Sequence, residues 1–490
     1  MTLGLMSTGA AGKAEDLLPW PGIPGRDEFF WITEVNKATL LTNLAKGLLT
    51  EDQAAQFGRA VKAVAEECAA VGSARPKMYI RYEPLVVAKA GLEATLMHAG
   101  RSSQDIHATF QRAILRDETL KLLTALASVV TGLLKMAEEN RDTLIPCYTN
   151  GVAAQPSNMA HVLLAHAQAF LRDMERSLAC YRRLNESPMG ACVLNGTGWP
   201  LDRDGMAAYL GFDKPVANTF DAGQVAGTDV CVDAALELVH PMLHVGQFIA
   251  ELMQQYAQPR PWILVSATYA SSAMPQKRNP GLINDCRRDA GLVIGEAQGV
   301  MMRMQNLTLG MADVRDEFAM GALAEDAATV IETFAGIVRS LHVDRERARD
   351  ELMNEWTCTQ EIADVLMRTA NIDFRTGHGF ASRFVTVART NGWTPKTVKP
   401  SDLHEVWKSF AEEHGLSPEF PLGDDLLKTV IEPEHILAGR RTPGSASPLM
   451  LEAQTEQADL HLAGLSTWLN FKQNEATKAA GLLEEKLAQI

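Results

Sequence analysis

The chain has 490 residues and a formal net charge of -14, with 46% hydrophobic and 22% charged residues. This length predicts two or three globular domains. The acidic balance argues against nucleic acid and anionic membrane surfaces as partners. No uninterrupted apolar run approaches the roughly eighteen residues of a membrane span. An anionic substrate would therefore need positive groups concentrated at its site.

Cysteine usage indicates the cellular compartment. Seven cysteines are scattered along the chain without a CxxC pair, which is typical of a reducing compartment, so we expect a cytoplasmic protein. The N-terminus lacks a basic-then-apolar signal pattern. Zinc-type His/Cys spacing, the GxGxxG motif and the P-loop motif are absent from the sequence, so we expect neither a metal nor another cofactor.

Helical periodicity dominates the chain from its N-terminal part onwards. Residues 33–57 predict a helix that is broken near Gly47. Apolar residues recur every three or four positions over 238–252 and 323–341, which predicts long amphipathic helices. Alternating runs are scarce, so the predicted fold class is all-α, with the long helices in a bundle. Helices that are apolar over most of their circumference would be buried by further chains, which indicates an oligomer.

Three domains are predicted from changes in this pattern. Residues 1–105 have shorter helices and form an N-terminal helical domain, and residues 106–355 form the central long-helix bundle. After residue 355 the helical pattern shortens again, so residues 356–490 are predicted to form a small C-terminal helical domain. Pro/Gly-rich stretches at 416–425 and 439–448 punctuate that last part.

One stretch, ASSAMPQKRNP at 270–280, has neither a helical nor a strand period. It is predicted to be a loop, and its two prolines, Pro275 and Pro280, limit its backbone freedom. A loop of small and polar residues gains little from burial. Such a loop is more typical of chemistry than of packing.

This loop resembles the signature GSSxMPxKxNP of the fumarase/aspartase superfamily, and it meets every fixed position except the leading glycine, which is Ala270. Within the superfamily the chain is most similar to the argininosuccinate lyase branch. The segment 187–215 is similar to that branch's SPLGAGALAGTxxPIDR region, and 363–378 is similar to its DYLVRKGxPFREAH segment. The similarity covers nearly the whole chain.

The resemblance implies a fold and an assembly. The family has three helical domains, and its central helices form a twenty-helix core in a homotetramer. Each active site in the family collects segments from three subunits. In this chain those segments would be 100–105, 148–156 and 270–280. The substrate would be a small dicarboxylate, and no cofactor would be needed.

The resemblance also implies roles for individual residues. The family reaction is an anti β-elimination that forms fumarate, and it needs a strong local base and cations aimed at a carboxylate, because proton removal yields a doubly charged aci-carboxylate. Ser271 aligns with the catalytic base, Lys277 with the cation beside the carboxylate, and Asn279 with the adjacent amide donor. The residues expected to bind substrate are Ser102, Ser103, Gln104, Thr149, Asn150, Ser272, Met274, Asn284 and Met311.

The chain departs from the branch pattern at several of these positions. Asn150 and Asn284 stand where the family has a His–Glu dyad linked to protonation of the leaving group, and Met311 and Asp313 replace a tyrosine and a lysine of the argininosuccinate site. We therefore expect release of fumarate and an amine from an N-substituted succinate other than argininosuccinate. The alternatives are elimination of a non-amine group such as nitrite, a cyclisation like that of the muconate-lactonising relatives, and a non-catalytic scaffold.

Overall fold

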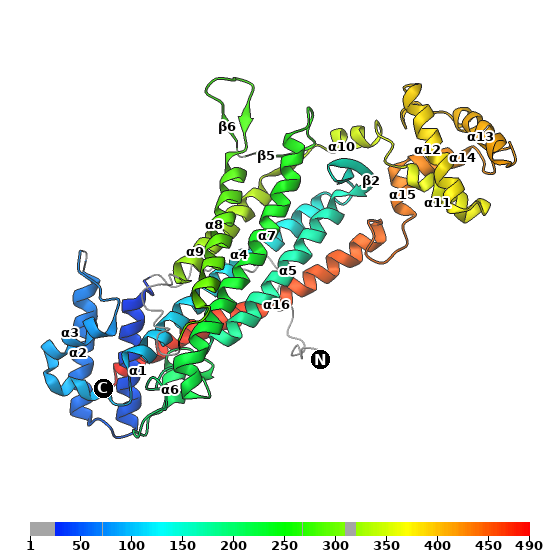
Figure 1. Ribbon diagram of the computed structural model, residues 1–490. Coiled ribbons are helices and arrows are strands. Elements are labelled where there is room, and N and C mark those ends of the chain that lie inside the picture. Colours follow the sequence, from blue (N-terminus) through cyan, green and yellow to red (C-terminus); the bar gives the residue numbers. More distant parts are fainter. Residues whose placement is uncertain (1–24, 71, 267, 309–319) are drawn as a thin grey trace.

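The structure is a computed structural model that describes residues 25–70, 72–266, 268–308 and 320–490. The described chain is elongated (Figure 1), with long helices in the middle, a group of shorter helices around α1 at one end and a second helical group from α11 to α15 at the other. The fold is all-α, as the sequence predicted. The strands that accompany the helices are short and form two-stranded pairs.

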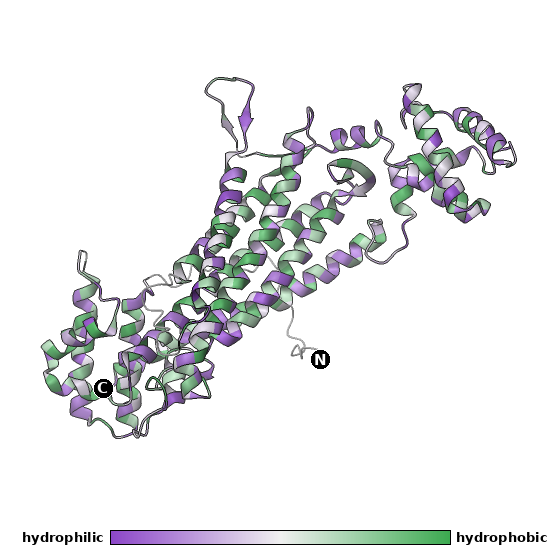
Figure 2. Ribbon diagram, viewed as in Figure 1, coloured by the Kyte–Doolittle hydropathy of each residue, from purple (hydrophilic) through white to green (hydrophobic). Residues whose placement is uncertain are grey.

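Five long helices form the central bundle and bury its largest apolar cluster. The most extensive packing joins α4 to α5 and to α9. The predicted helices at 238–252 and 323–341 correspond to α7 and α9. In Figure 2 the hydrophobic residues concentrate on these long helices. The five helices are α4 (Ser103–Glu139), α5 (Met159–Leu184), α7 (Ala226–Tyr256), α8 (Gly281–Met304) and α9 (Met320–Arg339).

Helix α4 is long and apolar enough to span a membrane, with a mean hydropathy of 1.6 over its most apolar eighteen residues. The search of the sequence for uninterrupted apolar runs did not reveal this helix, because charged residues divide its sequence. Within the part of the chain that the structure describes, 67% of that stretch is buried by neighbouring helices. Such burial is what the core helix of a helical bundle requires.

The N-terminal helices pack around their own apolar cluster. The predicted break near Gly47 is confirmed, because Gly47 has a φ of 67° between α1 and α2. Thr50 then starts the second helix with a capping box that involves Gln53. The elements of this end are α1 (Glu28–Ala45), α2 (Glu51–Ala69), α3 (Tyr79–Ala90), η2 (Leu92–His98) and α6 (Arg203–Tyr209).

The helices between residues 359 and 438 are short, as predicted, and pack around an aromatic cluster that contains Phe380 and Trp407. They are α11 (Thr359–Ala370), α12 (Phe374–Thr390), α13 (Pro400–His414), α14 (Asp425–Ile431) and α15 (Pro433–Ala438). The expectation of short helices is wrong for α16 (Pro448–Leu487), which has 40 residues and runs back along the bundle. Its buried positions recur every three or four residues over 458–476, with a gap of seven residues on either side, and half of them are small or polar side chains, a pattern easily missed in sequence.

The strands and the remaining helical segments connect these parts. β1 (Leu144–Thr149) and β2 (Val152–Asn158) pair antiparallel, as do β5 (Ile263–Val265) with β8 (Leu341–Val343) and β6 (Tyr269–Ala270) with β7 (Arg278–Asn279). β3 (Glu186–Ser187) and β4 (Lys214–Pro215) pair parallel. The remaining segments are η3 (Asp221–Val225) and α10 (Arg345–Leu352).

Candidate active site

The signature loop 270–280 is the tip of a hairpin that projects from the end of the bundle (Figure 1). Its base is the short ladder in which Tyr269 faces Asn279 and Ala270 faces Arg278. The amide of Ser271 donates to the carbonyl of Lys277 at 3.2 Å, which closes the loop across its neck. These backbone bonds explain how a segment without an apolar face can hold a defined shape.

Within this loop, Ser271 accepts two backbone hydrogen bonds through its hydroxyl oxygen. The amides of Ala273 and Met274 donate to Oγ at 3.3 and 3.2 Å. Donors aimed at an oxygen stabilise negative charge on it, so they favour the alkoxide that a serine base requires. The side chain of Lys277 is exposed, and its ammonium has no hydrogen-bond or ionic partner among the described residues. Its ammonium is therefore free to meet an anionic ligand.

The other predicted residues of this region flank these two groups. Ser272 and Met274 are exposed on the loop, and Asn279 is half-buried at its base. Asn284 lies on the first turn of α8 and is exposed. Met311 falls outside the described residues.

The first predicted segment is the start of α4. Ser102 is its N-cap and accepts from the amide of Gln104 at 3.2 Å, while Asp105 accepts from the amide of Ser102 at 2.6 Å in a capping box. Ser103 is half-buried on the first turn. The side-chain amide of Gln104 donates to the carbonyl of Gly223 at 3.2 Å, so one of its two N–H groups is already engaged within the chain.

Asp105 joins this helix start to the segment at 187–196. Its buried carboxylate also accepts from the amides of Gly190 and Cys192, at 3.1 and 3.3 Å. Burial raises the pKa of Asp105, although the amides of Ser102 and Cys192 act against that shift. Cys192 and Val193 have φ angles of 48° and 72°, and a β-branched residue such as Val193 is strained there. Asp105 therefore orients its neighbours.

The second predicted segment is the β1–β2 hairpin. Thr149 pairs with Val152, and the two residues between them, Asn150 and Gly151, have φ angles of 52° and 76°. Two successive left-handed residues indicate a type I′ turn, for which Asn-Gly is the preferred sequence. Thr149 and Asn150 are exposed at the tip. The Asn-Gly pair could have predicted this hairpin, but we interpreted the segment from its chemistry alone.

The three predicted segments do not meet within one chain. Ser102 precedes α4, and the β1–β2 hairpin follows that helix of 37 residues, whose length is about 55 Å at 1.5 Å per residue. The signature loop projects separately beyond α8. A site built from all three segments therefore requires more than one copy of the chain.

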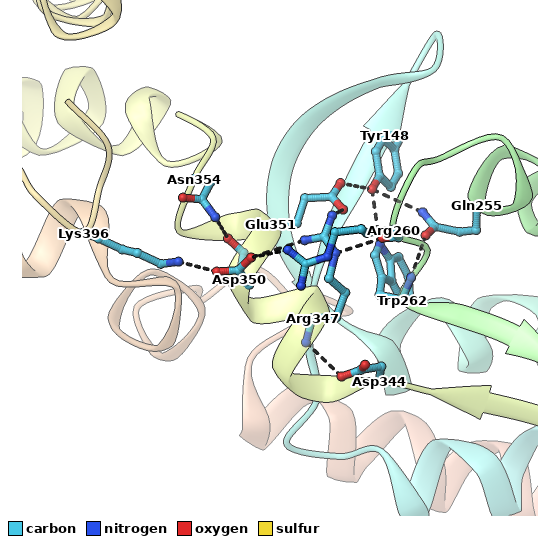
Figure 3. Close-up of polar contacts among 10 residues, drawn as sticks. All are labelled: Tyr148, Gln255, Arg260, Trp262, Asp344, Arg347, Asp350, Glu351, Asn354 and Lys396. Atoms are coloured by element: carbon cyan, nitrogen blue, oxygen red, sulfur yellow. Dashed lines mark hydrogen bonds and ion pairs between the residues drawn. The ribbon is translucent and has the colours of Figure 1, made fainter. Parts of the chain in front are cut away.

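Tyr148, which the sequence did not single out, lies next to Thr149 and joins the hairpin to α10 (Figure 3). Its hydroxyl donates to the carboxylate of Glu351 and accepts from Gln255 Nε2 at 3.2 Å and from Trp262 Nε1 at 3.3 Å. Glu351 follows Tyr148 by about two hundred residues, so no local pattern could have revealed the contact.

Comparisons with known proteins find lyases. A lyase family model matches residues 48–295. Argininosuccinate lyase from Methanothrix thermoacetophila is 29% identical over 475 residues, covering 94% of each chain. The enzyme of that name from Methanocorpusculum labreanum is 31% identical over 394 residues, covering 79% of this chain and 77% of the relative.

Solved structures share the fold. EDDS lyase in complex with formate superposes with a TM-score of 0.86 at 24% identity, covering 98% of this chain and 96% of that chain. The β-carboxy-cis,cis-muconate cycloisomerase from Acinetobacter calcoaceticus gives a TM-score of 0.66 at 16% identity, covering 89% and 95%. At these identities the two structures establish the architecture alone.

Proposed function

We propose that this chain, a fumarate-forming carbon–nitrogen lyase, cleaves an N-substituted succinate into fumarate and an amine. The chain belongs to the lyase family, in the argininosuccinate lyase-like branch of the fumarase/aspartase superfamily. The observation that carries this proposal is the geometry of the signature loop. Two amides converge on the hydroxyl oxygen of Ser271, and the cation of Lys277, in the same loop, has no ionic partner within the part of the chain that the structure describes.

In the proposed reaction Ser271 removes the proton from the carbon beside a substrate carboxylate. Lys277 and Asn279 stabilise the negative charge that develops on that carboxylate, where an oriented donor or cation has its largest effect. Further hydroxyl and amide side chains bind the dicarboxylate, and Met274 contacts it as an apolar neighbour. The polar residues are Ser102, Ser103, Gln104, Thr149, Asn150, Ser272 and Asn284. The electron pair of the broken C–H bond forms the new double bond as the C–N bond breaks. The C–N electron pair leaves with the nitrogen, which departs as a neutral amine because an aliphatic amine of the substrate is already protonated at neutral pH.

We propose that this site is assembled in a homotetramer, with three subunits contributing to each site. The separation of the segments along α4 supports more than one copy. A surface on α8 supports the same conclusion: Asn284, Gly291, Gly295 and Met302 recur at helical spacing on its exposed face. Nothing within the described chain lies within 4 Å of a Cβ placed at either glycine. Glycine weakens a helix by about 1 kcal/mol relative to alanine, and close approach of another helix would explain its use.

Residues that differ from the branch pattern restrict the choice of leaving group. Met311 and Asp313 replace a tyrosine and a lysine, so an arginine-bearing substrate fits poorly. The second candidate leaving group is nitrite, which departs without protonation. Asn150 and Asn284 favour nitrite as the leaving group. They replace the His–Glu dyad that the family links to protonation of the leaving group, and their amides cannot supply that proton.

A screen in both directions tests the proposal. In the reverse direction, fumarate is mixed with a panel of amines and its ultraviolet absorbance is followed; in the forward direction, nitrosuccinate and several N-alkyl aspartates are supplied. Amine-dependent consumption of fumarate supports the amine as leaving group, and fumarate release from nitrosuccinate alone supports nitrite. No change with any compound contradicts both.

A further inference from the structure

The turn that carries Thr149 and Asn150 has few restraints of its own. The β1–β2 ladder ends at the Thr149–Val152 pair, and both turn residues are exposed. The register also shifts beside Tyr148: Cys147 faces Gln155, whereas Tyr148 faces Ala153, which leaves one extra residue on β2. Such a bulge bends a strand and redirects side chains, and bulges are frequent next to active sites.

A cavity of about 450 Å³ lies under the same hairpin. It is lined by Tyr148 and Asn150 of the hairpin, by Met159 of α5, and by Phe248 and Leu252 of α7. Protein interiors normally fix side chains by close packing. Since Tyr148 and Asn150 border this cavity, the tip of the hairpin has less packing on that side, and polar contacts there contribute to holding it.

Tyr148 supplies those contacts. A phenol has one donor and two acceptor sites, and all three are used, by Glu351, Gln255 and Trp262. The amide of Trp262 in turn donates to Gln255 Oε1 at 3.2 Å, so the partners are linked with each other. Burial, followed by the hydrogen bond to Glu351, raises the pKa of Tyr148 to about 12, and the phenol therefore remains a donor at neutral pH.

Helix α10 is a firm anchor for this contact. The Glu351 side chain is only 14% exposed and lies 3.4 Å from the guanidinium of Arg347, whose Nε donates to the carbonyl of Arg260 at 2.9 Å. The neighbouring Asp350 lies 3.6 Å from the guanidinium of Arg347 and accepts from the ammonium of Lys396, which precedes α13 (Figure 3). The hairpin is thereby tied to the C-terminal helices.

We propose that Tyr148 is a positioning residue that holds the Thr149–Asn150 turn in its working geometry through Glu351 of α10. This inference rests on the proposed function, in which Thr149 and Asn150 contact the substrate. Tyr148 itself need not touch the substrate. A site requires its groups to be held within a fraction of an ångström, and residues behind the contacting ones provide that restraint.

The test is Tyr148→Phe, which keeps the ring and removes the hydroxyl. We expect kcat for fumarate formation to fall at least tenfold while KM changes less than threefold, because the dicarboxylate would still meet Lys277 and Asn279. Glu351→Gln keeps an acceptor and should retain at least a third of the wild-type rate. Glu351→Ala should resemble Tyr148→Phe, and the double variant Tyr148→Phe/Glu351→Ala should be no slower than either single variant.

Hydrogen exchange of residues 148–156, measured by mass spectrometry, separates this inference from the proposed function. Exchange there should accelerate at least fivefold in Tyr148→Phe, with no change over 187–215. Tyr256→Phe is the matched control, since its hydroxyl accepts from the amide of Val265 and does not contact the hairpin; it should leave kcat and hairpin exchange unchanged. Unaltered hairpin exchange in Tyr148→Phe would overturn the inference. Accelerated exchange in a protein without any turnover would support the anchor and contradict the proposed function.

Discussion

Replacement of Lys277 by methionine is the most informative single change in the signature loop. The side chain is exposed and has no described ionic partner, so its loss breaks no ion pair and should change the free energy of unfolding by less than about 0.5 kcal/mol. The cation should act when the substrate carboxylate gains its second negative charge. Loss of one such stabilising group typically costs about 3 kcal/mol, which corresponds to a rate decrease of about a hundredfold.

The assay is the initial rate of fumarate formation over a range of substrate concentrations, with thermal unfolding of the same samples. Lys135→Met is the matched control, because it removes the same charge from an exposed position on α4. We expect kcat to fall about a hundredfold in Lys277→Met and to stay unchanged in the control. A rise of KM at constant kcat would refute the reasoning, since it would make Lys277 a group that attracts substrate without stabilising the transition state.

Three further predictions follow from the same structure. Rebuilding the family dyad with Asn150→His and Asn284→Glu should leave native turnover unchanged or lower. Each single change should be worse than the pair, because a lone introduced charge has no partner. A tenfold gain in turnover by the double variant would contradict this. Inactive Ser271→Ala and Ser102→Ala chains, mixed and refolded together, should regain about a quarter of the wild-type rate if sites are shared between subunits, whereas no recovery would count against shared sites. Burial raises the pKa of Glu237 from 4.5 to about 7; the folded state therefore favours its protonated form, and stability is lost as pH rises from about 4.5 through 7. Glu237→Gln should stabilise the protein at pH 8 by about 1–2 kcal/mol after solvent screening is allowed for, with no difference below pH 4, and unfolding curves that differ equally at both pH values would contradict this assignment.

Much of the fold could be predicted from the sequence, because the long helices carry wide apolar stripes. The stripe at 238–252 corresponds to part of α7, the one at 323–341 to α9, and Gly47 marked a real helix break. Helix α16 was missed because its buried positions form a narrow seam, about one residue per turn, in which Ala458, Ser466 and Gln473 are small or polar. A narrow seam gives little periodic signal within a short window of sequence.

The site was only partly predictable for a different reason. The signature loop is contiguous, so its residues were recognisable together, and the backbone donors to Ser271 come from residues two and three positions later. The contact of Tyr148 with Glu351 joins positions that are distant in sequence, and the Asp105 carboxylate is held by amides more than eighty residues away. Such contacts depend on the packing of whole elements, which one sequence does not reveal.

The central claim, that Ser271 is the base of a fumarate-forming elimination, is tested most directly by comparing the wild-type protein with Ser271→Ala on the best substrate of the screen. Fumarate release and sedimentation would be measured on the same samples. We predict that the variant sediments like the wild type and retains less than about one percent of its rate, because it loses the hydroxyl oxygen on which the amides of Ala273 and Met274 converge. A variant that forms the same assembly and retains more than a tenth of the rate would contradict the assignment of Ser271 as the base.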